Sequence, residues 1–270
     1  MNSLVVYFVL ANLFSWIIWL PLYGHLIGLE NLPKLPYHHG IGGLGPLLSS
    51  LITTWIFLKV DGIKNLIKRC LQLKPFLYFL IALMSPFVIA ISAILFQAYT
   101  NSTPIDLEGL TRSKEFPEMD LLFTFLYNVL FFGFGEEVGW RGFALPRFQT
   151  KWNALTSSLL LTFFWAFWHL PLFFYRPGYI AMDISGILGW IFSLLTGSIL
   201  LTWLYNSSKG SIAICAIFHS TIDIAFTSDI SDSTIMNYMG IFITIWGIVT
   251  LLLFKPKNLS FLERTKFLFK

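Results

Sequence analysis

Long apolar runs separated by short polar connectors make up most of the chain. A stretch of about 20 mostly apolar residues crosses the hydrocarbon core of a bilayer as a helix. The pattern predicts an all-α, polytopic membrane helix bundle of about eight transmembrane helices, forming a single integral membrane domain over residues 1–270. The predicted spans are 4–24, 41–58, 76–99, 120–145, 155–175, 184–205, 210–227 and 237–254.

The composition excludes an ordinary soluble protein. Hydrophobic residues make up 56% of the chain and charged residues only 12%, whereas about one quarter of the residues in soluble domains are charged. The first apolar run has no basic segment before it and no small-residue cleavage site, so we expect a retained helix rather than a signal peptide. Nothing in the sequence supports nucleic-acid binding.

The placement of the basic residues predicts the orientation. If the N-terminus is cytoplasmic, 14 of the 18 Lys and Arg residues fall on the cytoplasmic side. Positive charge favours that side of a membrane. We therefore predict that both termini are cytoplasmic. The four basic residues expected on the outer side are Lys34, Arg112, Lys114 and Arg176.

Ionisable side chains inside the predicted spans are the candidate functional residues, because such groups are costly in a bilayer. Glu136 lies towards the end of the fourth span, His169 lies in the fifth, and His219 and Asp223 lie in the seventh. We count 1.5 Å per helical residue from the expected cytoplasmic end of each span. The count places Glu136, His169 and His219 in the inner half to the middle of the bilayer. We expect them to meet in the bundle interior, as in other helix bundles with buried sites.

Two adjacent glutamates in the fourth span have different expected roles. Glu137 and Arg141 are four residues apart and share a helix face, whereas Glu136 is rotated by about a quarter turn. Arg141 can neutralise Glu137, which leaves Glu136 to face the bundle interior as a general base. The simpler alternative is a carboxylate pair that caps a helix end.

The histidines allow more than one interpretation. His219 and Asp223 are four residues apart on one helix face, as a hydrogen-bonding pair or a pair of metal ligands requires. His169 by itself is typical of a hydrogen-bonded core histidine. Three helices that each carry a catalytically capable group at membrane depth favour a shared site.

Three motifs over residues 120–227 resemble those of the CPBP intramembrane proteases, which include CAAX prenyl endopeptidases and proteins linked to bacteriocin processing and self-immunity. EEVGWR at 136–141 matches the family's two glutamates, three residues and arginine. WAFWH at 165–169 has the spacing of the second motif, although Trp165 stands where phenylalanine is usual. HSTID at 219–223 resembles the third, a histidine followed by asparagine or aspartate, with Asp223 four positions after His219.

The resemblance implies an intramembrane endopeptidase that acts on peptide or protein substrates in or at the membrane. Glu136, helped by His169, would activate a water for attack on a peptide carbonyl. His219 and Asp223 would stabilise the oxyanion, with Glu137, Arg141 and Trp165 in support. No serine or cysteine nucleophile stands beside a base in this pattern, so no acyl-enzyme is indicated.

A metal cofactor remains open at this point. A carboxylate such as Asp223 in an apolar bundle is disfavoured as an ion, so it must be protonated or bound to a cation. The nitrogen and oxygen donors of Glu136, His169, His219 and Asp223 suit a divalent metal such as zinc. We favour a metal-free site, because the nearby residues already supply a base and oxyanion donors.

Two other functions fit the same residues. One is a non-proteolytic membrane immunity or scaffold protein, and the other is a proton-coupled transporter with Glu136, His169 and Asp223 as a relay. The sequence has no paired broken helices or inverted repeat of the kind seen in many transporters. The compact length and the lack of organelle-targeting signals indicate a bacterial plasma membrane.

The orientation is tested with a reporter fused after Lys270 that is active only outside the cytoplasm. We expect no reporter activity, because the basic residues hold the C-terminal end inside. The same reporter fused in the loop around Lys34 is the matched control and should be active. Activity of the Lys270 fusion would contradict the predicted topology.

Overall fold

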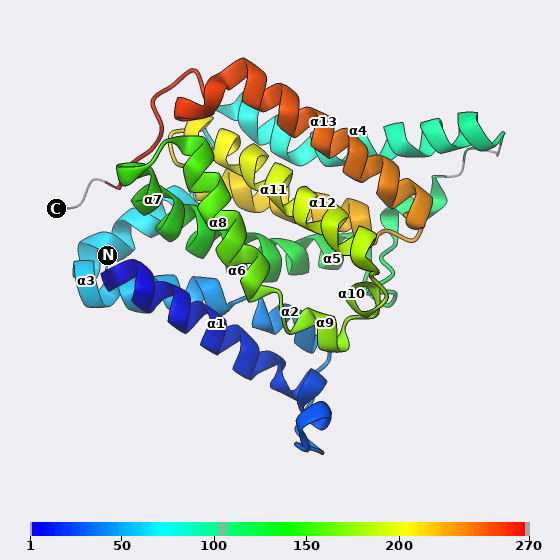
Figure 1. Cartoon of the computed structure of the whole chain (residues 1–270), viewed down its shortest axis with the longest axis horizontal. Coiled ribbons are helices and arrows are strands. Elements are labelled where there is room, and N and C mark those ends of the chain that lie inside the picture. The colour runs from blue at the N-terminus through cyan, green and yellow to red at the C-terminus, as the bar shows by residue number, and fades with distance from the viewer. Residues whose placement is uncertain (1, 103–104, 106, 268–270) are drawn as a thin grey trace.

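The chain folds into a bundle of helices (Figure 1). The computed structural model describes residues 2–102, 105 and 107–267, and within these residues it contains helices and turns but no strand longer than an isolated bridge between Ser113 and Ser228. The all-α membrane bundle predicted from the apolar runs is confirmed. The principal helices are α1 (Asn2–Tyr23), α3 (Gly45–Cys70), α4 (Phe76–Asn101), the continuous run Leu121–Lys151, α8 (Ala154–Trp168), α11 (Ile184–Ser207), α12 (Ile212–Thr227) and α13 (Ser233–Asn258).

Seven described helical segments are long and apolar enough to cross a membrane. The remaining predicted span, 210–227, corresponds to α12, which has only 16 residues. At 1.5 Å per residue it is about 24 Å long, shorter than the roughly 30 Å hydrocarbon core. Buried residues occupy most of α12, so it lies inside the bundle, where a short helix needs no contact with the full thickness of the lipid.

The two ends of the bundle differ. Figure 1 shows the N- and C-terminal regions at the same end, and there the backbone N–H of Phe267 donates a hydrogen bond to the carbonyl of Pro146. The arrangement agrees with termini on one side of the membrane; which side that is remains a prediction, and Lys270 lies outside the described residues. The opposite end carries the short helices η1 (Gly24–Ile27), α2 (His38–Gly42), η2 (Glu108–Thr111), α9 (Leu172–Tyr175) and α10 (Pro177–Ile180).

The fourth span is longer and less regular than predicted. It joins α5 (Leu121–Tyr127), the π-helical η3 (Asn128–Phe134), α6 (Gly135–Gly139), the π-helical η4 (Trp140–Ala144) and α7 (Leu145–Lys151). The predicted span ended at residue 145, whereas the helical run continues to Lys151. Arg141 and Arg147, which count among the 14 basic residues expected on the cytoplasmic side, are buried. Each finds a partner inside: Arg141 pairs with Glu137, and Arg147 donates to the carbonyl of Phe143 and stacks on its ring.

Two further boundaries differ from the sequence expectation. The helix α3 continues to Cys70 through a break at Lys59, whose φ is 53°, so the expected connector at 59–75 is mostly helix. The helix α8 ends at Trp168, and His169 is its C-terminal cap rather than a mid-helix residue. Pro171 explains this end, because proline lacks an N–H and disfavours helical conformation in the residue before it.

Glycines let the glutamate-bearing helix approach its neighbours closely. A Cβ on Gly133 would lie 2.6 Å from the carbonyl oxygen of Ala216 in α12. A Cβ on Gly139 would lie 2.4 Å from the Tyr7 hydroxyl and 2.6 Å from Pro46. Both positions therefore exclude a side chain.

A buried ion pair fixes the middle of this span. Arg141 Nη1 lies 2.7 Å from Glu137 Oε1, and both side chains are fully buried. The same carboxylate oxygen accepts a hydrogen bond from His219 Nδ1 in α12, at 2.8 Å. Glu137 thus joins α6 to its own next turn and to a different helix.

Glu137→Gln and Arg141→Ala should each reduce the amount of folded protein. Removing one member of a buried pair leaves the other charge without a partner, which costs roughly 3–5 kcal/mol. The measurement is the thermal stability of purified protein in detergent, together with its expression level. Lys151→Ala, at an exposed position of the same helical run, is the control; equal stability of all three variants would contradict the pairing.

Candidate active site

Glu136 lies between α6, α8 and α12, with 4% of its surface exposed. Its Oε2 accepts two indole N–H groups, from Trp165 at 2.8 Å and from Trp140 at 3.2 Å. Its Oε1 lies 4.0 Å from His219 Nε2. One oxygen is therefore held in place by donors, while the other faces His219.

His219 is oriented from both sides of its ring. Nδ1 lies 2.8 Å from Glu137 Oε1, and because a carboxylate oxygen accepts, this nitrogen carries the proton. Nε2 faces Asp223 Oδ2 at 3.6 Å as well as Glu136. A histidine whose one nitrogen is fixed by a carboxylate presents the other nitrogen in a defined direction.

Trp165 connects the parts of the site. Its indole N–H holds Glu136, the guanidinium carbon of Arg141 lies 4.9 Å from the ring centroid, and the His219 ring packs edge-on at 5.6 Å. A phenylalanine at this position could fill the same space but could not donate to Glu136. The departure from the usual motif residue thus adds a hydrogen bond to the glutamate.

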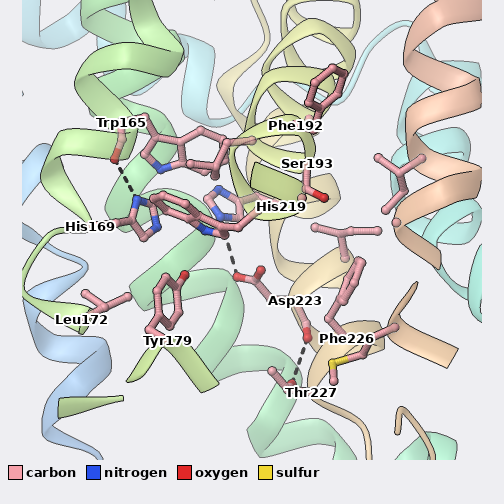
Figure 2. A pocket seen from close by; sticks show the side chains of 18 of the residues that line it. Trp165, His169, Leu172, Tyr179, Phe192, Ser193, His219, Asp223, Phe226 and Thr227 are labelled. Carbon is pink, nitrogen blue, oxygen red and sulfur yellow. Dashed lines mark hydrogen bonds and ion pairs between the residues drawn. The ribbon is translucent and has the colours of Figure 1, made fainter. Parts of the chain in front are cut away.

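His169 lies next to Trp165 (Figure 2). Its Nδ1 is 2.7 Å from the carbonyl oxygen of Trp165, so Nδ1 donates and Nε2 is left as the acceptor of a neutral ring. Four aromatic rings surround it, those of Trp165, Trp168, Tyr179 and Trp190. Burial raises the pKa of the Tyr179 hydroxyl to about 12, so this group stays neutral near pH 7.

All four candidate residues line one cavity of about 1080 Å³. Pockets that hold small molecules are typically about 300–1,000 Å³, so this cavity has room for an extended stretch of peptide. Figure 2 shows Asp223 and His219 facing the same space as His169, with Phe192 and Ser193 of α11 on the far side. Most of the lining is apolar, and the ionisable groups lie together at one part of it.

The arrangement does not fit a metal site well. Among the described residues, no three His, Cys, Asp or Glu side chains converge closely enough to hold a metal ion. Glu136 Oε2 is occupied by two indole donors, and His219 Nδ1 is occupied by Glu137. We therefore derive no catalytic step from zinc, although the four side chains were candidate ligands.

The structure brings together the four residues selected from the sequence and adds contacts that the sequence did not indicate. Glu137 was expected to pair with Arg141, but its bond to His219 crosses between helices and has no sequence signal. The contact of Trp140 with Glu136 does have a sequence signal, because the two residues are four apart on a helix. Tyr179 and Trp190 come from outside the three motifs, and no sequence pattern selected them.

Comparison with known proteins agrees with these motifs. Residues 118–225 match the family described as type II CAAX prenyl endopeptidase Rce1-like. A relative named CAAX prenyl protease 2, from Methanococcus maripaludis, is 29% identical over 120 residues, which is 43% of this chain. The chain spans 42% of the length of that relative.

The matched segment covers α5 to α12 almost completely and contains Glu136, Trp165, His169, His219 and Asp223. Over this segment, the chain is similar to the Rce1-like type II CAAX prenyl endopeptidases.

Proposed function

We propose that the protein is an intramembrane endopeptidase in which Glu136 activates a water molecule. The observation that carries this proposal is the asymmetric setting of the Glu136 carboxylate. Two indole N–H groups fix one oxygen, and the other oxygen faces His219 in a cavity large enough for peptide. A general base needs this combination of fixed orientation and a free lone pair.

The reaction divides between a base and oxyanion donors. Glu136 takes a proton from water as the oxygen of that water forms a bond to the peptide carbonyl carbon. The proton then passes from Glu136 to the amide nitrogen as the C–N bond breaks, which releases a carboxylic acid and an amine. His169 assists by accepting a hydrogen bond from the same water through Nε2.

His219 and Asp223 stabilise the negative charge on the carbonyl oxygen. Carboxylates face both nitrogens of His219, and a ring protonated on Nε2 can donate to the oxyanion. Asp223, when protonated, donates as well. One such donor is typically worth about 2.7–4 kcal/mol in the transition state.

The substrate is a peptide or protein in or at the membrane, as the name of the relative and the apolar cavity suggest. Whether it carries a prenyl group is a property of the substrate that the site residues do not define. The cell membrane concerned is the bacterial plasma membrane, as expected from the sequence. The lipid bilayer is the second partner, since the spans are apolar.

Glu136→Gln should lower cleavage by roughly 10²–10⁴-fold, the usual contribution of a general base. His169→Ala should also abolish cleavage, and both proteins should stay folded. The measurement is N-terminal proteomics of membranes from cells that express each form, which identifies the new peptide ends made only by the wild type. Glu118→Gln, at an exposed glutamate, is the matched control.

Equal activity of the wild type and Glu136→Gln on a substrate found in this way would exclude the mechanism. A phenotype that persists in Glu136→Gln without any cleavage would favour the immunity or scaffold function instead.

Asp223→Asn should keep most of the activity. An asparagine amide can donate to the oxyanion in place of a protonated carboxyl, whereas it replaces an anionic ligand poorly. Metal analysis of the purified wild type is made beside the activity assay. Stoichiometric zinc together with an inactive Asp223→Asn variant would overturn the metal-free site.

A further inference from the structure

A second cavity lies at the end of the bundle that carries the chain termini. It has a volume of about 500 Å³, and residues of α1, α7, α8 and the C-terminal tail line it. Figure 1 shows the start of α1 and α7 at this end. None of its lining residues also lines the cavity that holds Glu136. The two cavities are therefore separate sites.

Two basic side chains line this second cavity. Arg147 and Lys151 are four residues apart on α7, so they share a helix face. No acidic residue lines the cavity, and among the residues that the structure describes neither cation forms an ion pair. The cavity therefore has a positive charge that no described lining residue balances.

Arg147 is the more constrained of the two cations. Only 8% of its surface is exposed. Its guanidinium carbon lies 3.5 Å from the ring centroid of Phe143 and 3.9 Å from that of Phe267, and its Nη1 donates to the carbonyl of Phe143. Its Nε has no hydrogen-bond partner within the described chain. A buried charge without an opposite charge is costly, so the cavity is suited to an anion.

The rest of the cavity is mostly apolar. The rings of Phe8, Phe148 and Phe164 line it and stack on one another, with 3.9 Å between the centroids of Phe8 and Phe164. Val5 and Val9 of α1 also line it and are 60% and 51% exposed. Since α1 is long and apolar enough to span a membrane, these exposed side chains face acyl chains. The cavity thus joins a cationic part to a lipid-facing surface.

We propose that this cavity binds an anionic phospholipid. The phosphate lies at Arg147 and Lys151, and an acyl chain lies along Val5, Val9 and Phe164. Arginine binds phosphate through both its charge and its directed N–H groups, and basic pockets between membrane helices bind anionic lipid headgroups. A soluble anion could satisfy the two cations, but it would leave the apolar part of the cavity without an occupant.

The aromatic residue at the edge of the cavity fits this lipid. Trp152 lines the cavity, is 40% exposed and stands between α7 and α8. Tryptophan is enriched at the boundary between headgroups and acyl chains. A lipid here contacts α1, α7 and α8 together, so we expect it to stabilise the fold. The site goes beyond the proposed function, and it is the same whichever side of the membrane the termini occupy.

Lipid binding is tested with the full-length protein purified in a neutral detergent. Native mass spectrometry follows the binding of phosphatidylglycerol and phosphatidylcholine with identical acyl chains. We expect the wild type to retain one phosphatidylglycerol in preference to phosphatidylcholine. Lys151→Gln should weaken phosphatidylglycerol binding by roughly fivefold, the effect of one basic residue near a membrane surface, and Arg147→Gln should weaken it further. Lys68→Gln is the matched control and should bind as the wild type does, because Lys68 is an exposed lysine in the last turn of α3 that does not line the cavity.

Thermal unfolding distinguishes a lipid from a free anion. Phosphatidylglycerol should raise the unfolding midpoint of the wild type by roughly 2–4 °C, since a ligand of the folded state stabilises it, and inorganic phosphate should not. An equal rise with inorganic phosphate would assign the cavity to a soluble anion and overturn the inference. Phosphatidylglycerol binding that appears only after removal of residues 268–270 would assign it to the C-terminal tail, with the same consequence.

Equal binding of the two lipids by the wild type would also overturn the inference. So would unchanged phosphatidylglycerol binding by Lys151→Gln, which decides the matter even where Arg147→Gln fails to fold. None of these measurements needs cleavage of a substrate. A protein that binds the lipid as expected but cleaves nothing would contradict the proposed function and leave the lipid site intact.

Discussion

The carboxylate of Glu137 is the group on which the site depends. A fully buried carboxylate is tolerated only when it is paired and hydrogen-bonded, and Glu137 has Arg141 on its own helix and His219 on another. Because one oxygen serves both partners, the position of α12 relative to α6 is fixed by the same contact that orients the imidazole. The structural ion pair and the orientation of the His219 ring are therefore one interaction, and the adjacent Glu136 takes no part in it.

Tryptophan performs a polar role in an apolar setting here. At membrane depth the indole supplies a large apolar surface together with one N–H that must find an acceptor. Trp140 and Trp165 both direct this N–H at the same oxygen of Glu136. Since indole only donates, the two rings fix the carboxylate without competing for its proton. Trp165 also covers Arg141, so the buried cation and the proposed general base Glu136 share one aromatic neighbour.

The sequence predicted the apolar spans, because hydrophobic length is nearly sufficient to specify a membrane helix. It also selected Glu136, His169, His219 and Asp223, because ionisable groups at membrane depth are rare. It did not predict the helical continuation to Lys151, since a buried arginine such as Arg147 looks like a connector residue until its partner is known. It could not reveal the bond from Glu137 to His219 either: residue spacing relates neighbours on one helix, whereas contacts between helices depend on how Gly133 and Gly139 let those helices approach.

The packing at the end of the bundle that carries the chain termini favours the proposed hydrolase over a transporter. A transporter must expose its central site alternately to the two sides of the membrane, which requires a path on each side or packing that can open. Towards the chain termini, the Tyr7 and Phe143 rings stack at 4.9 Å beside Trp140, and all three are fully buried. Opening a path there would break close packing of large aromatic rings, which a protein interior resists. A peptidase needs only one route for water, substrate and products, and among the described residues the cavity that holds Glu136 also reaches Glu115 and Arg176, at the end away from the chain termini.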